Sequence, residues 1–509
     1  MNLQKKDKLI LAAIPLVFYI AFWLIDGAVW CADSISYVTM YDSREPLYPT
    51  LLALFRRVIG YRESLPVEEQ PYLFWVAGFQ SLLAAFATGS IAFFLTEHFK
   101  LNRIGSCLVM MIPIGVSLLN RFAARRGSMY SNCILTEGIT ISIYLLFFRY
   151  ELEYIFEGSR KGFIIAALLA FAGITARKQM YVLAGLLIVG ELLGWIRDGK
   201  RELKRWIIPG VALILIFTAS GGFDRIYNYA LRGAFIRHTE DNRFVTTVAM
   251  YTADRNFAEY IDPEIRDVFL EIYDECDASG YLGNSAPTGW MASVDHFGKN
   301  YDHIQLDVME AVLERTVDDL DYEPLEGSRL HSERMDIVRA AFNKALIPHE
   351  IGRLFRLVVF NFLSGLVLTA AKMNGVLVVY SVAVYAFYLM MLGILTRKCS
   401  DLRTDSSALK TAGSAGGVII EETEHTAACI ADSERKYEPD RMIACRDAVL
   451  TGVFVLFGIV MNVGLVSAVI FCQTRYTIYN MPLLYCAMII MGRGITIITP
   501  ADRKSAGKG

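Results

Sequence analysis

The sequence predicts an all-α polytopic membrane protein with about ten transmembrane helices. Of the 509 residues, 54% are hydrophobic and only 20% are charged, whereas a typical soluble domain carries about 25% charged residues. The apolar residues also form blocks of about 20 residues, the length that crosses the hydrocarbon core of a bilayer. We expect spans at 9–27, 71–95, 104–120, 133–149, 162–176, 179–195, 207–222, 375–396, 448–471 and 477–498.

The bulk composition excludes several other classes of protein. The nine cysteines are odd in number and include no CxxC pair, which argues against a disulfide scaffold or a zinc ribbon. The formal net charge of −2 gives no reason to expect a nucleic-acid partner. No cluster of metal ligands is visible, so we assign no metal-ligating residue and no certain cofactor, and leave a divalent metal possible.

Lysine and arginine are more frequent in the loops on one side of the predicted spans. Because cytoplasmic loops carry the excess of positive charge, both termini should be cytoplasmic, in a multi-pass protein of the cell (plasma) membrane. The chain then divides into five parts: an N-terminal membrane module, 1–222, with its first outer loop at 28–70; an outer helical insertion, 223–353; an interfacial helix plus a transmembrane helix, 354–398; a flexible cytoplasmic linker, 399–447; and a C-terminal transmembrane hairpin, 448–509.

Three of these assignments depend on local patterns. Apolar residues at helical spacing, such as Ile265, Val268, Phe269 and Ile272, predict helices in the insertion. Arginine and polar residues interrupt the apolar stretch 354–371, which favours a helix lying at the membrane interface over a span. The amphipathic stretch 49–60 in the first outer loop favours a second interfacial helix.

Asp33 and Asp42 are the candidate catalytic carboxylates, because both follow the first span on the outer side. A carboxylate at the mouth of a membrane cavity can take a proton from an attacking hydroxyl. The alternative for Asp33 is an ordinary N-cap of the segment SISYVTM. The alternative for Asp42, which is followed by Ser43 and Arg44, is an ordinary turn.

Charged residues from distant segments share the outer face in this topology. Glu137 begins the fourth span, Arg177 and Lys178 separate the fifth and sixth, and Arg475 precedes the last. Each has a simple alternative: the helix dipole for Glu137, and snorkelling to lipid headgroups for the cations. Lysine and arginine are usually more frequent in cytoplasmic loops than in outer loops. A lipid-linked phosphate at the outer leaflet would account for these cations on the outer face.

Taken together, these segments resemble the GT-C superfamily of integral-membrane glycosyltransferases, which includes protein O-mannosyltransferases and aminoarabinose transferases. The resemblance rests on Asp33 after the first span and on four motifs in the family's order: REPLYPTLL (44–52), LTE (135–137), GITARKQMYVL (173–183) and QTRYTIYNMP (473–482). It implies that Asp33 is the catalytic carboxylate, with Asp42 as a looser second acid.

The same resemblance implies roles for other residues. Arg475 and Arg177 would contact the carrier phosphate; Lys178, Tyr476 and Arg44 would be further donor-binding residues; and Glu137 and Tyr48 would belong to the cavity wall.

The expected activity is transfer of a sugar from a polyprenyl-phosphate carrier to an acceptor hydroxyl at the outer face of the membrane. We expect the reaction to invert the configuration at C1 of the sugar. The acceptor is left open between a protein, a lipid and a glycan. Two alternatives belong to other classes: a transporter or flippase of a lipid-linked saccharide, and a non-catalytic protein with the same fold. The gathering of polar residues at one outer edge favours the enzyme over a transporter, whose polar residues lie at mid-membrane.

Overall fold

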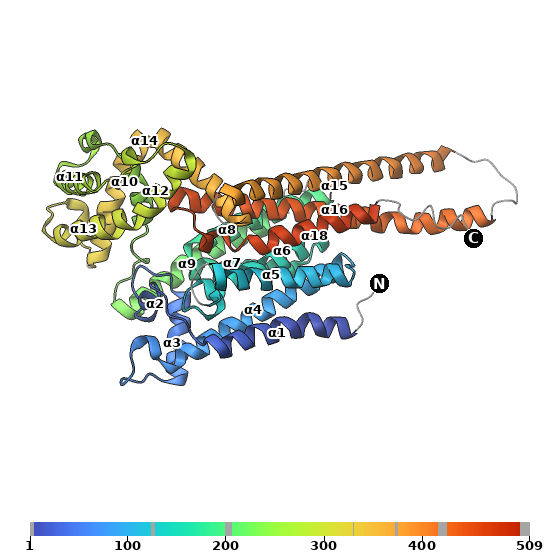
Figure 1. Cartoon of the computed structure of the whole chain (residues 1–509), viewed down its shortest axis with the longest axis horizontal. Helices are drawn as coiled ribbons and strands as arrows, with labels where there is room; N and C mark the ends of the chain where they lie inside the picture. Colours follow the sequence, from blue (N-terminus) through green and yellow to red (C-terminus); the bar gives the residue numbers. More distant parts are fainter. Residues whose placement is uncertain are drawn as a thin grey trace.

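The computed structural model describes residues 5–123, 128–198, 206–328, 330–371, 375–415 and 425–498, and its regular structure in these ranges is helical. Long helices with roughly parallel axes form a bundle, and a lobe of shorter helices lies at one end of it (Figure 1). We call this the lobe end. The start of α1 and the far ends of α15 and α16 lie at the opposite end (Figure 1).

All ten predicted spans are helices in the structure. They are α1 (Lys5–Asp26), α4 (Pro71–His98), α5 (Arg103–Ala123), α6 (Glu137–Glu157), α7 (Arg160–Ala176), α8 (Tyr181–Asp198), α9 (Ile207–Arg232), α15 (Gly375–Ala415), α16 (His425–Val469) and α18 (Met481–Ile498). Among the described residues, eight helices are long and apolar enough to cross a membrane. The predicted fold class, an all-α polytopic membrane protein, is confirmed.

Within the described ranges, eight helices meet the length and hydropathy expected of a span, whereas ten spans were predicted, because three of the predicted helices are too short or too charged. Helices α7 and α18 have only 17 and 18 residues, and α6 carries Arg149, Glu151 and Glu153 in its second half. Helix α14 (His331–Ala370), which we did not count as a span, is long and apolar enough to be included.

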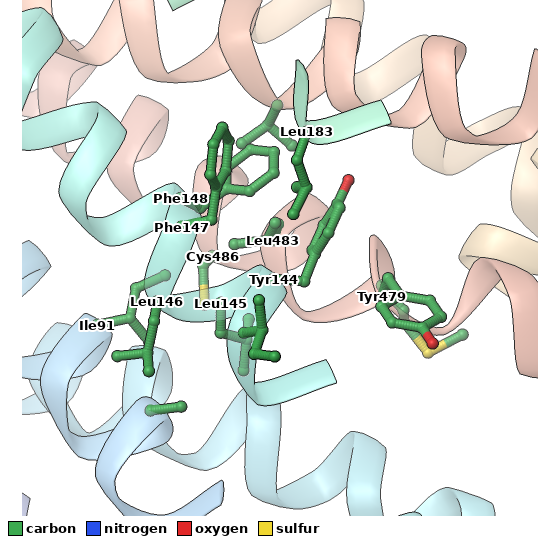
Figure 2. Close-up of a cluster of buried hydrophobic side chains, with 14 of the residues drawn as sticks. Ile91, Tyr144, Leu145, Leu146, Phe147, Phe148, Leu183, Tyr479, Leu483 and Cys486 are labelled. Atoms are coloured by element: carbon green, nitrogen blue, oxygen red, sulfur yellow. The ribbon is translucent and has the colours of Figure 1, made fainter. Parts of the chain in front are cut away.

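Helix α6 lies at the centre of the bundle and packs against α4, α7 and α8. Its aromatic residues Tyr144, Phe147 and Phe148 are fully buried, and Leu183 of α8 and Cys486 of α18 belong to the same cluster (Figure 2). Burial on all sides explains why its apolar residues show no amphipathic stripe, as expected of a helix inside a membrane bundle.

Small residues let the helices approach closely, as is usual in membranes. A Cβ atom at Gly78 of α4 would lie 2.5 Å from the Trp23 ring of α1, and one at Gly458 of α16 would lie 2.6 Å from Phe148. The Trp23 indole also donates a hydrogen bond of 2.9 Å to the carbonyl of Phe74. The first outer loop therefore begins from a fixed helix pair, α1 and α4.

The first outer loop contains two helices. Helix α2 (Ser34–Val38) is a single short turn, and α3 (Leu47–Ile59) is amphipathic, as predicted for 49–60. Its apolar residues Leu54 and Val58 are exposed, which suits contact with lipid at the interface.

The lobe is helical, as predicted, and consists of α10 (Arg243–Thr252), α11 (Pro263–Ala278), α12 (Trp290–Asp302), the π-helix η7 (His303–Glu310), α13 (Ala311–Thr316) and the first half of α14. It has its own hydrophobic core, which includes Phe269, Phe297 and Phe342. The lobe begins later than the expected residue 223, because α9 continues to Arg232 and ends at Gly233, whose φ of 71° favours glycine.

The segment 354–371 differs from the interfacial helix that we expected. It is the second half of α14, beyond a kink at Glu350 that follows Pro348. The Asn361 amide donates to the carbonyls of Ser467 and Ile470 at 3.1 and 2.7 Å, so this half packs lengthwise against α16. Asn361, one of the interrupting polar residues, thus satisfies backbone groups of the neighbouring segment.

The segment 399–447 also differs from the flexible linker that we expected. Helix α15 continues to Ala415 and α16 begins at His425, while 416–424 lie outside the described residues. Alanine and glutamate, which favour helix, account for 12 of the 49 residues of this segment.

The start of α1 and the far ends of α15 and α16 lie at the end of the bundle opposite the lobe (Figure 1), so the orientation in the membrane can be tested with one residue at each end. In a variant without native cysteines, Ser285→Cys in the lobe should react with an impermeant thiol reagent in intact cells, because Ser285 is exposed at the lobe end. Ser400→Cys on α15 should react only after permeabilisation. The reverse pattern would place the lobe in the cytoplasm and contradict the orientation drawn from lysine and arginine.

Candidate functional site

Two loops at the lobe end are joined by backbone hydrogen bonds. The Val29 N–H donates to the Asn132 carbonyl at 2.8 Å, and the Ile134 N–H donates to the Val29 carbonyl at 3.0 Å. The Ser34 hydroxyl donates to the Ile134 carbonyl at 2.8 Å. These bonds place the start of α2 beside the start of α6, although the two are about 100 residues apart in the chain.

Two further loops are held against the same place. The Gln179 amide donates to the carbonyl of Tyr476 at 2.6 Å and to Asn462 Oδ1 at 2.7 Å. The Thr140 and Tyr479 hydroxyls lie 2.8 Å apart. The turn between α7 and α8 and the segment before α18, which includes α17 (Thr474–Thr477), therefore lie against α6.

Asp33 lies between two arginines from different loops. Arg475 Nη1 donates to Asp33 Oδ2 at 3.1 Å, and Arg44 Nη2 donates to Asp33 Oδ1 at 3.3 Å. Arg44 also donates to the hydroxyl of Ser36 at 2.8 Å, and its guanidinium lies 4.6 Å from the centre of the Tyr37 ring. Asp33 keeps a third of its side chain exposed, so it remains accessible.

Glu137 is the second carboxylate of the site and is almost fully buried. Its Oε2 atom lies 2.8 Å from Arg177 Nη1, and its Oε1 atom lies 3.6 Å from Arg475 Nε. Arg177 also donates to the Thr136 hydroxyl at 2.9 Å. The Tyr476 ring lies beside both guanidinium groups, 5.3 Å from that of Arg177 and 4.9 Å from that of Arg475.

The site gathers three guanidinium groups around two carboxylates. Arg44 and Arg475 face Asp33, and Arg177 and Arg475 face Glu137. Burial alone would raise the pKa of Asp33, but Arg475 and Arg44 outweigh this effect and hold it below its usual range. Asp33 is therefore ionised at neutral pH.

The structure can be compared with the simpler roles considered for these residues: a helix N-cap, a helix-dipole contact and contacts to lipid headgroups. Asp33 does occupy the N-cap position of α2, but its side chain makes no capping hydrogen bond. Glu137 is the first residue of α6, where the helix dipole favours a carboxylate, and it also pairs with arginine. Arg177 and Arg475 pair with carboxylates instead of extending to headgroups.

Three predicted site residues do not join the Asp33–Glu137 cluster. Asp42 accepts a hydrogen bond from the Ser332 hydroxyl of the lobe. Tyr48 is fully buried behind Tyr37, and its hydroxyl donates to Gln80 at 2.8 Å. The Lys178 ammonium lies 2.6 Å from Asp241, so it faces the lobe instead of Asp33.

The structure also brings residues to the site that sequence reasoning missed. Glu45 accepts a hydrogen bond of 2.9 Å from the Lys178 backbone N–H. Asp302, from the lobe, interacts electrostatically with Arg475 and Asp33. The signal for Glu45 was its place in REPLYPTLL, whereas nothing in the local sequence around Asp302 pointed to the site.

A small, partly open cavity with an accessible volume of about 30 Å³ lies beside Glu137, between α1, α4, α5 and α6. Its lining includes Tyr19, Thr88, Asn120 and Pro482 and is mostly apolar. Glu137 thus lines a cavity, while in the described ranges no group of three or more His, Cys, Asp or Glu side chains could hold a metal ion.

Comparisons with known proteins give little beyond this geometry. No protein-family model matches the sequence, and no curated protein matches it. A solved structure that matches is that of ArnT from Cupriavidus metallidurans bound to undecaprenyl phosphate. The two chains are 10% identical, the match covers 91% of this chain and 77% of that one, and the TM-score is 0.30, too low to define the site.

The buried pair of Glu137 and Arg177 leads to a stability prediction. Glu137→Leu should lower the free energy of unfolding by about 3–5 kcal/mol, because it leaves the Arg177 guanidinium buried without its partner. Arg177→Met should have a similar effect, and the double variant should lose less than the sum. Equilibrium unfolding in detergent would measure this coupling.

The exposed pair of Arg255 and Asp274 serves as the control. Arg255→Met should leave the free energy of unfolding close to that of the wild type, because solvent screens an exposed ion pair. Equal losses at Arg177 and Arg255, or strict additivity at Glu137 and Arg177, would contradict a buried, coupled pair.

Proposed function

We propose that this protein is a membrane glycosyltransferase that moves a sugar from a polyprenyl-phosphate carrier to an acceptor hydroxyl at the outer face of the plasma membrane. The observation that carries the proposal is the Asp33–Glu137 cluster, in which two carboxylates and three arginines from four distant segments meet at one end of the bundle. Its arginines are well shaped to hold a phosphate, and a carboxylate is present to act as a base.

In the proposed reaction, the acceptor oxygen attacks C1 of the sugar and forms the new glycosidic bond. The bond between C1 and the phosphate oxygen breaks, and its electron pair remains on the carrier phosphate. The acceptor proton passes to Asp33, which is ionised and a third exposed. Attack from the face opposite the phosphate inverts the configuration at C1.

Arg475 and Arg177 would stabilise the charge that develops on the leaving phosphate. Arginine suits this role, because its planar fork can hold two phosphate oxygens at once. The carboxylates Asp33 and Glu137 hold both guanidinium groups in place before the donor arrives. Donor phosphate then competes with Asp33 for Arg475, and this exchange would leave Asp33 free to accept a proton.

Transport of a lipid-linked saccharide is a second candidate, and one observation favours it. Glu151 of α6 and Glu191 of α8 are fully buried, about 20 Å along α6 from Glu137 by helical rise. The Tyr154 hydroxyl donates to Glu191. Carboxylates within membrane spans often belong to ion or proton pathways. Proton-coupled flipping by the wild type, abolished by Glu151→Gln, would favour transport over transfer.

The role of Asp33 as the base leads to the first functional test. Asp33→Asn should lower the rate of sugar transfer by about 10²-fold or more, because the amide keeps the shape but cannot accept the proton. Mass spectrometry of products from purified protein and a panel of polyprenyl-phosphate sugars would measure it. Asp274→Asn is the matched control on the lobe surface, and normal turnover by a folded Asp33→Asn protein would exclude Asp33 as the base.

The role of Arg475 in donor binding leads to a separate test. Arg475→Ala should raise the donor KM at least tenfold, and Arg475→Lys should recover only part of the loss, since lysine lacks the planar fork. Titration with polyprenyl phosphate would report the same loss without chemistry. If Arg475→Ala binds the carrier as well as the control Arg255→Ala does, Arg475 has a purely structural role.

A further inference from the structure

A second charged network lies next to the site, on its lobe side. The imidazole of His238 is buried between two carboxylates: Nδ1 lies 2.5 Å from Asp224 Oδ2, and Nε2 lies 2.8 Å from Asp241 Oδ1. The His238 backbone N–H also donates to Asp224 at 3.0 Å. Both ring nitrogens thus lie within ion-pair distance of a carboxylate oxygen, an arrangement that favours the doubly protonated imidazolium.

This network connects directly to the turn that carries Arg177. The Asp241 oxygen that faces His238 also lies 2.6 Å from the Lys178 ammonium, and the Lys178 backbone N–H donates to Glu45 at 2.9 Å. The turn at Arg177–Met180 is thus held from two directions. Asp241 holds it from the lobe, and Glu45 holds it from the first outer loop.

We propose that His238 is a positioning residue, whose imidazolium fixes Asp241 against Lys178 and thereby holds the Arg177 guanidinium in place for the carrier phosphate. The effect on carrier binding rests on the proposed function, whereas the positioning of the turn does not. Asp224, in the second half of α9, anchors the ring. The irregular segment that carries His238 and Asp241 is also joined to the first outer loop, because the Thr239 N–H donates to the Asp42 carbonyl at 2.9 Å.

The electrostatic surroundings support a ring that stays charged near neutral pH. Burial favours the neutral ring, but the hydrogen bonds to Asp224 and Asp241 outweigh it and raise the pKa of His238 to about 9. Lys178 opposes the charge and Glu45 favours it. The Arg237 guanidinium also lies 4.0 Å from Asp224.

The sign of the pH dependence follows from this raised pKa. An unfolded histidine has a pKa near 6.5. The stabilisation from the charged ring is therefore complete below about pH 6.5 and is lost as the pH rises through about 9. The phosphate monoester of the carrier is fully ionised throughout that upper range, since its second pKa is near 6, so it does not titrate at the same point.

The test combines carrier binding with a measurement that needs no carrier. Binding of a polyprenyl phosphate in lipid nanodiscs should weaken by about tenfold in His238→Ala at pH 7.5. In the wild type, affinity should fall with a midpoint near pH 9. His238→Arg, which keeps a charged group with several N–H donors, should restore part of the affinity and abolish that midpoint.

Hydrogen–deuterium exchange of the unliganded protein is the independent measurement. The Lys178 and Met180 amides, which donate to Glu45 and to the Arg177 carbonyl, should exchange at least tenfold faster in His238→Ala than in the wild type. The matched control is His349→Ala, because the exposed His349 ring bonds to the Ala345 carbonyl of its own helix and stacks on Tyr260, so its loss should leave both readouts unchanged.

The outcomes separate this inference from the proposed function. Equal amide protection in His238→Ala and the wild type would overturn the inference, whatever the carrier data show. An unchanged binding midpoint in His238→Arg would overturn it as well. Faster exchange in a protein whose wild type binds no polyprenyl phosphate would support the positioning of the turn and contradict the proposed function.

Discussion

The arrangement of the lobe end depends on one constraint: charges at the edge of a membrane bundle need partners. Arg475 satisfies it by lying between Asp33 and Glu137, and Arg177 satisfies it by pairing with Glu137. Each charge comes from a different loop, so pairing them fixes the loops relative to one another. An isolated buried charge would cost several kcal/mol, which makes the paired arrangement strongly preferred.

The remaining polar contacts at this end follow from the same constraint. The amides of Gln80, Gln179 and Asn361 each contact the backbone of a segment far away in the sequence. Each satisfies carbonyl groups that irregular backbone would otherwise leave unpaired in a place with little water. Irregular segments can therefore enter the bundle, and these segments carry the charged residues.

The lobe is part of this arrangement and does not merely cover it. Its core contacts the bundle through Phe471, which lies four residues before Arg475 in the chain. The Phe471 ring is 5.1 Å from the ring of Tyr301 in the lobe. On the other side, Asp241 reaches Lys178. The lobe thus contacts the segments that carry Arg475 and Arg177, and its Ser332 hydroxyl donates to Asp42 in the loop that carries Arg44. A change in the packing of the lobe would reach the site through these segments.

The sequence by itself determined the helical class, the ten apolar helices and the identity of most charged residues in the site, because hydropathy and charge are local properties of the chain. It could not determine which charges pair. Asp33 and Arg475 are 442 residues apart, and only packing of the helices brings them together. The second half of α14 and the positions of Lys178, Asp42 and Tyr48 were decided in the same way. Each side chain takes the partner that the tertiary structure places within reach, and no local pattern encodes that partner.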